Sequence, residues 1–189
     1  MQLMHLPRLR QATRQERAAL QALPVMEKLW MLSLAAQEKR QLLARFFVLL
    51  HGMEKQLLPY FSKMTLEEFN WASWLLSPEL AKTLVSLKQP LPEETLPEQS
   101  LEISTLPQAL GSAWALLHVS CVVVQLLPDC HGKALDTRLL QQLEDLAEIY
   151  CSSPGDLMAA KNAASQTLTC LRLELEAWED QSCVLAASA

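Results

Sequence analysis

The longest apolar segment of the chain, Ala109–Leu127, contains no charged residue in 19 positions. Its sequence is ALGSAWALLHVSCVVVQLL. The other long segments carry charge on one face, and a helix that is apolar all round is normally buried by its neighbours. We therefore predict that this stretch is the central helix of the domain, opened by Pro107 and ended by Pro128.

Amphipathic segments on both sides of this stretch predict the helices that surround it. Their apolar residues recur at intervals of three and four, which is the spacing of one helix face. The predicted helices cover residues 9–23, 26–32, 33–58, 65–75, 79–87, 137–150 and the residues from 154 onward, with fraying after Gln181. Three of the apolar faces consist of Leu42, Leu43, Phe46, Phe47, Leu50, Met53 and Leu57; of Leu139, Leu143, Leu146 and Tyr150; and of Ala160, Ala164, Leu168, Leu171, Leu175 and Trp178.

The stretch Gln89–Pro107 interrupts this helical pattern with four prolines and four glutamates. Such a composition disfavours a regular helix and is typical of a long surface connection. Neither half of the chain offers a complete core by itself, so we interpret the stretch as a loop over one domain. The sequence thus predicts a single all-α domain over residues 1–189, a bundle of about seven helices.

Composition narrows the class of protein. Half of the 189 residues are apolar, a fifth are charged, and only four are glycine, which disfavours a turn-rich β fold. The net charge of −5 argues against non-specific nucleic-acid binding. The five cysteines are odd in number and form no C-x-x-C pair, which indicates reduced thiols in a cytoplasmic protein. The N-terminal residues lack the apolar core of a signal peptide.

The central stretch is also long enough to cross a membrane. Its polar residues and the lack of basic residues at its ends argue against that role. These polar residues are Ser112, His118, Ser120 and Gln125. We expect a core helix and no membrane partner.

Two residues near the predicted core are polar. Arg17 follows Leu9 and Thr13 on one face of the first helix, so its guanidinium needs a carboxylate or carbonyl partner or must reach solvent along its stem. His51 lies beside the apolar face of the helix over 33–58. We expect a half-buried, hydrogen-bonded histidine there rather than a metal ligand.

The sequence contains none of the local motifs of common enzymes. There is no H-E-x-x-H, G-x-S-x-G, P-loop or dinucleotide-binding glycine pattern, and the four histidines are scattered. We therefore predict no catalytic residue and no metal site, with His118 as the remaining metal-ligand candidate. Trp71 and Trp74 are interpreted as core or subunit-interface residues, which leaves a homodimer open.

Two stretches of the chain resemble bacterial haem oxygenases, particularly the phytochrome-associated type that produces biliverdin. Leu9-Arg10-Gln11-Ala12-Thr13 with Arg17 and Leu20 is similar to the family's opening pattern L-R-x-A-T-x-x-x-H-x-x-L. Ala109-Leu110-Gly111 with Trp114-Ala115-Leu116 resembles the distal helix, roughly A-L-G-x-x-Y-V-L-E-G-S-x-L-G-G. Residues 79–87 and 168–178 resemble two further helices of the family. The resemblance implies a haem oxygenase-like helical bundle.

The chain departs from the family at the residues that bind haem. The axial histidine of the family corresponds to Arg17, whose guanidinium offers no lone pair to iron. The distal glycines correspond to His118, Val122 and Val123, and the family's glutamate before its first glycine corresponds to Leu117. Side chains at glycine positions fill the space over a porphyrin and stiffen the helix.

Three interpretations follow. The first is a haem oxygenase-like protein that has lost haem oxygenation and binds an unknown protein partner or small ligand, with no cofactor. The second is an active, haem-degrading oxygenase in which His118 reaches iron, while Arg10, Arg14 and Arg17 attract propionates. A buried His118 hydrogen-bonded to a carbonyl one turn away is the simpler expectation. The third is a thiaminase-type hydrolase with Cys121 as its nucleophile. We favour the first.

Overall fold

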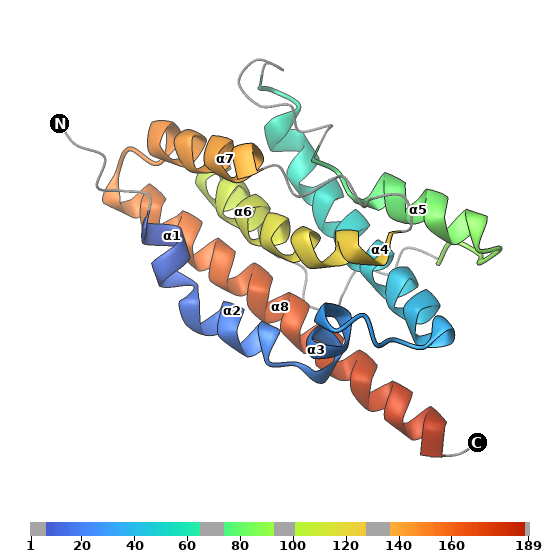
Figure 1. The fold of residues 1–189 in the computed structure, drawn as a ribbon. Coiled ribbons are helices and arrows are strands. Elements are labelled where there is room, and N and C mark those ends of the chain that lie inside the picture. The colour runs from blue at the N-terminus through green and yellow to red at the C-terminus, as the bar shows by residue number, and fades with distance from the viewer. Residues whose placement is uncertain (1–6, 65–73, 93–100, 128–136, 188–189) are drawn as a thin grey trace.

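The computed structural model describes residues 7–64, 74–92, 101–127 and 137–187, and every regular element within these ranges is helical. The fold is an all-α, single-domain bundle (Figure 1). In chain order its α-helices are α1 (Pro7–Ala12), α2 (Arg14–Gln21), α3 (Pro24–Trp30), α4 (Ala36–Phe61), α5 (Ser77–Ser86), α6 (Leu106–Val123), α7 (Thr137–Tyr150) and α8 (Pro154–Ala187), with a 3-10 turn, η2 (Val124–Leu126), after α6.

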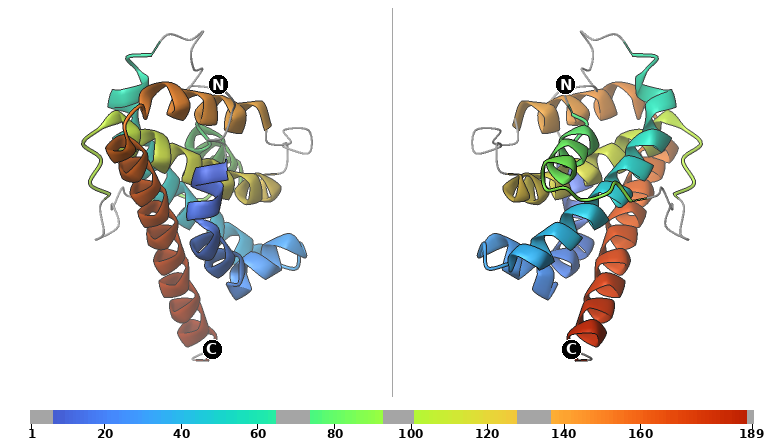
Figure 2. Two further views of the ribbon diagram at one scale, coloured as in Figure 1. Left: turned by 90° about the vertical axis from the view of Figure 1, so that its left-hand side faces the viewer. Right: turned by 90° about the vertical axis from the view of Figure 1, so that its right-hand side faces the viewer.

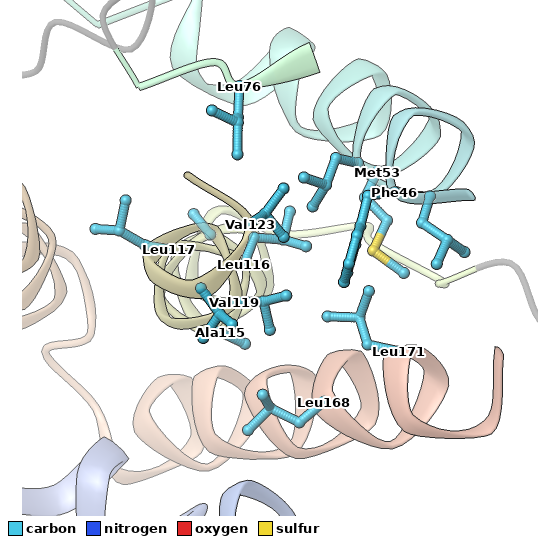
Figure 3. Packing of buried hydrophobic residues seen from close by; sticks show 14 of the residues in the cluster. Phe46, Met53, Leu76, Ala115, Leu116, Leu117, Val119, Val123, Leu168 and Leu171 are labelled. Atoms are coloured by element: carbon cyan, nitrogen blue, oxygen red, sulfur yellow. The ribbon is translucent and has the colours of Figure 1, made fainter. Parts of the chain in front are cut away.

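Helix α6 lies at the centre of the bundle, as its uncharged sequence predicts. It packs against α8, α7 and α4, while α1 and α2 lie along α8 (Figures 1 and 2). Its side chains join those of α4 and α8 in one continuous core (Figure 3). Among the described helices, α6 alone is long and apolar enough to cross a membrane, and 72% of this 18-residue helix is buried inside the protein. Packing within the bundle therefore accounts for its apolar character.

Small residues allow α6 and α8 to approach closely. A Cβ atom added to Gly111 would lie 2.0 Å from the carbonyl oxygen of Ala160. One residue further along α6, the Ser112 hydroxyl accepts a hydrogen bond of 3.0 Å from the Thr167 hydroxyl of α8, and both side chains are fully buried. The contact is thus fixed by a glycine and by one buried polar pair.

Side chains cap several of the described helix ends. At the start of α6, Thr105 and Gln108 form a reciprocal capping box, in which Gln108 N donates to Thr105 Oγ1 and Thr105 N donates to Gln108 Oε1. At α5, the buried carboxylate of Glu54 accepts hydrogen bonds from the backbone N–H of Leu76 and of Ser77. Residue Glu179 of α8 accepts one from a backbone N–H of α3. Side chains distant in sequence therefore complete two of these ends.

Most of the predicted apolar faces are confirmed. The predicted face of α4 is buried throughout, and that of α8 is buried from Ala160 to Leu175, with Trp178 partly buried. In α7 the prediction was wrong at Tyr150, which is 36% exposed, whereas Ala147 is buried in its place. Residue 147 lies four positions after Leu143 and continues that buried face.

Several helix boundaries differ from the predictions. The helix predicted over 9–23 is divided at Thr13, whose backbone leaves helical geometry at φ −100° and ψ 16° while its hydroxyl donates to the Leu9 carbonyl. Such back-bonding by a threonine often bends a helix. Helix α8 continues to Ala187 and does not end near Gln181. The helix predicted from Thr65 lies outside the described residues, apart from its last two positions.

Candidate functional site

Arg17 and His118, which are 101 positions apart in the sequence, meet at the ring of Trp114. The Arg17 Cζ atom lies 5.9 Å from the centroid of the Trp114 ring, within the range of a cation–π contact. The His118 ring packs edge-on against the same tryptophan, with 4.2 Å between the ring centroids. Trp114 itself is almost fully buried, so it fixes both side chains between α2 and α6. We call Arg10, Arg17, Trp114 and His118 the Arg17 cluster.

Arg17 has a carbonyl partner and no counter-charge. Its Nη2 atom donates a hydrogen bond of 2.8 Å to the backbone carbonyl of Arg10, which is one of the partners expected from the sequence. Its Nε atom is buried without a hydrogen-bond partner. Among the described carboxylates, none forms an ion pair with Arg17. Burial and then the charge of Arg10 lower the pKa of Arg17, although a guanidinium stays protonated.

His118 is neutral at pH 7. Burial, reinforced by the charges of Arg17 and Arg10, lowers its pKa from 6.5 to about 4. The hydrogen bond expected between its ring and a carbonyl one turn away is not formed within the described part of the chain, so that prediction was wrong. The carbonyl of Leu117, the residue before His118, accepts a hydrogen bond from the thiol of Cys121. The imidazole therefore contributes an unprotonated nitrogen beside two guanidinium groups.

The other positions matched to the family's distal helix lie in the core. Leu117 and Val122 are 1% and 4% exposed, and Val123 is fully buried. Figure 3 shows Val123 on the side of α6 that faces α4 and Leu76, and Leu117 on another side. Of these positions, His118 shares the Trp114 ring with Arg17. Val123 fills space toward α4 (Figure 3).

Trp114 and Glu144 were not singled out by sequence reasoning. Trp114 precedes His118 by four positions, so helical spacing alone places them on one face. Its Nε1 atom lies 3.4 Å from Glu144 Oε1 of α7, a long hydrogen bond. Burial raises the pKa of Glu144, while the bond to Trp114 and the charge of Arg10 oppose that rise. No local pattern could have revealed Glu144, because its partners come from other helices.

Glu144 also lines a partly open groove of about 600 Å³ between α1, the end of α7 and the start of α8. Its lining includes the apolar residues Leu9, Ala147 and Leu157 and the charged residues Glu148 and Lys161. None of Arg17, Leu117, His118 and Val122 lines it. The groove and the Arg17 cluster are therefore separate features that share Glu144 as a neighbour.

The remaining candidates do not assemble into a catalytic or metal centre. Burial raises the pKa of Cys121, the opposite of what a nucleophilic thiol requires. Within the described ranges, no group of three or more His, Cys, Asp or Glu side chains could hold a metal ion. His51 is half-buried, stacks on Phe47 and lies 3.2 Å from the Ser77 hydroxyl, as expected for a hydrogen-bonded structural histidine.

A haem held as haem oxygenases hold it does not fit these residues. Arg17, which the sequence resemblance matches to the family's axial histidine, has no lone pair, and its guanidinium contacts the Arg10 carbonyl and the Trp114 ring. Comparison with known proteins adds no constraint: no family model, curated protein or solved structure matches the chain.

Proposed function

We propose that this protein is a haem oxygenase-like protein that has lost haem oxygenation and acts as a binding, regulatory or interaction protein. The observation that carries the proposal is the packing of Arg17. The resemblance places its guanidinium where the family has an axial histidine, and this guanidinium packs against the Trp114 ring. Trp114 is almost fully buried, so the ring that the guanidinium packs on belongs to the core.

The alternative is an active haem oxygenase with altered ligation, and one observation favours it. His118 keeps a neutral imidazole because its pKa is lowered to about 4, and neutral imidazole is a common ligand of haem iron. Against it stands the contact with Trp114, whose ring centroid lies 4.2 Å from that of the histidine. Binding of iron by His118 would compete with this packing of the imidazole against Trp114.

Titration of the purified protein with haem tests both. We expect no stoichiometric complex with a sharp Soret band, because neither Arg17 nor the covered His118 offers iron a site. Changing Arg17→His should not create such a complex either, since Trp114 and the buried side chains of α6 remain in place. A stoichiometric Soret complex in the wild type that is lost in His118→Ala would establish the alternative. A stable complex in Arg17→His would show that the space beside α6 is larger than we infer.

A further inference from the structure

We propose that the Arg17 cluster binds the oxyanion group, phosphate or carboxylate, of a small ligand. This inference rests on the proposed function only in treating the cluster as a binding site without haem. It starts from a charge that the protein leaves unbalanced. Arg17 is partly buried, and a guanidinium that loses part of its hydration is stabilised by a carboxylate or phosphate partner.

Arg17 lacks such a partner. Its hydrogen bond goes to a backbone carbonyl, and the buried Nε atom has none. The neighbouring acid on the same helix, Glu16, is directed to α8, where its Oε1 accepts a hydrogen bond of 2.6 Å from Ser165. Glu144 reaches the Trp114 side of the cluster and not the guanidinium. The counter-charge for Arg17 is therefore not supplied by the described residues.

The neighbours of Arg17 suit an anion. Arg10 adds a second positive charge that acts on Arg17 and on His118. The neutral imidazole of His118 can donate one N–H hydrogen bond, and the Trp114 ring holds the guanidinium in place. A planar guanidinium fixed in this way is suited to bidentate contact with two oxygens of one group. The chemistry shared by these contacts is that of a phosphate or a carboxylate.

The experiment is a titration with inorganic phosphate and, in a second arm, with acetate, each at pH 7 and at ionic strength held constant with sodium chloride. Chemical shifts of the His118 ring and the thermal midpoint are followed together. We expect saturable shifts at His118 and a rise in the midpoint with one of the two anions. Saturation by phosphate alone assigns the site to phosphate ligands, and saturation by acetate alone assigns it to carboxylates.

Two variants on the same face and helix sharpen the test. Arg17→Met keeps the stem and the packing on Trp114 but removes the charge, and it should weaken binding at least tenfold. Arg14→Gln is the matched control, since Arg14 is exposed and does not act on His118; its binding should equal that of the wild type. Equal binding by wild type and Arg17→Met would overturn the assignment.

The haem titration separates this proposal from the proposed function. No Soret complex together with phosphate or acetate binding that depends on Arg17 supports both. No Soret complex and no saturable binding of either anion overturns the oxyanion site alone. A stoichiometric Soret complex through His118 overturns both.

Discussion

The close contact of α6 and α8 makes Gly111→Ala a direct test of the core. The added Cβ would lie 2.0 Å from the carbonyl oxygen, 2.7 Å from the carbonyl carbon and 3.0 Å from the Cα atom of Ala160. All three are backbone atoms, so no side chain can rotate to relieve the clash. One of the two helices must move, and with it the buried hydrogen bond between Ser112 and Thr167.

The magnitude follows from two opposing contributions. Overpacking of a core typically costs about 1–3 kcal/mol, and contact with rigid backbone places this case near the upper end. Alanine is favoured over glycine within a helix by roughly 0.5–1 kcal/mol. The net loss in the free energy of unfolding should be about 2 kcal/mol. For a chain of this size, that corresponds to a decrease of roughly 4–8 °C in Tm.

Urea and thermal unfolding followed by circular dichroism measure this loss. The control is Gly155→Ala near the start of α8, where a Cβ would meet its nearest atom, Ser153 Oγ, at 3.6 Å. That variant should be as stable as the wild type or slightly more so. The double variant Gly111→Ala/Ala160→Gly should remain destabilised, because the obstructing atoms are not the Ala160 side chain. A Gly111→Ala protein as stable as the wild type would refute the inferred interhelical distance.

Two further predictions concern pH. Burial raises the pKa of Glu54 above its ordinary 4.5, so the stability linked to this group is present below pH 4.5 and is lost as the pH rises through the folded value. Between pH 4 and 8, the urea midpoint of Glu54→Gln should therefore fall less than that of the wild type. If the urea midpoints of the two proteins changed in parallel with pH, the burial of this carboxylate would be contradicted. The pH dependence linked to His118 has the opposite sign. Its folded pKa of about 4 lies below 6.5, so its contribution to stability is present above pH 6.5 and is lost as the pH falls. Relative to His118→Phe, the wild type should lose up to about 3 kcal/mol between pH 6.5 and 4, and an NMR titration of His118 with a midpoint near 6.5 would disprove this.

The helical class of the fold could be predicted because burial repeats along this chain with the period of a helix. Leu42, Phe46 and Leu50 occupy the face that their spacing indicates. Places where a side chain interrupts the helical pattern, or where a neighbouring residue is buried in place of the expected one, could not be predicted in the same way. The hydroxyl of Thr13 donates a hydrogen bond to the Leu9 carbonyl, and the expected helix is divided into two at this residue. In α7, Ala147 is buried whereas Tyr150 is exposed.

Less of the candidate site could be predicted. The pattern placed Arg17 among core-facing positions and left open whether its guanidinium has a partner or reaches solvent; in the structure the side chain is partly buried and bonds to a carbonyl. The tryptophan that contacts both Arg17 and His118 could have been predicted, because Trp114 lies one helical turn before His118. The role of Glu144 could not, because the contact depends on how α7 crosses α6. Glu54 likewise caps a helix that begins more than twenty residues later, which no local signal encodes.

The position of α8 against the first helices has a consequence for the order of folding. The backbone N–H of Val25 at the start of α3 is satisfied by Glu179, and Glu16 of α2 is bonded by Ser165. These partners are 154 and 149 positions apart. Such contacts close very long loops, and contacts of this kind slow folding. These two hydrogen bonds of α2 and α3 can thus form only after α8, more than a hundred residues later in the chain, has been synthesised.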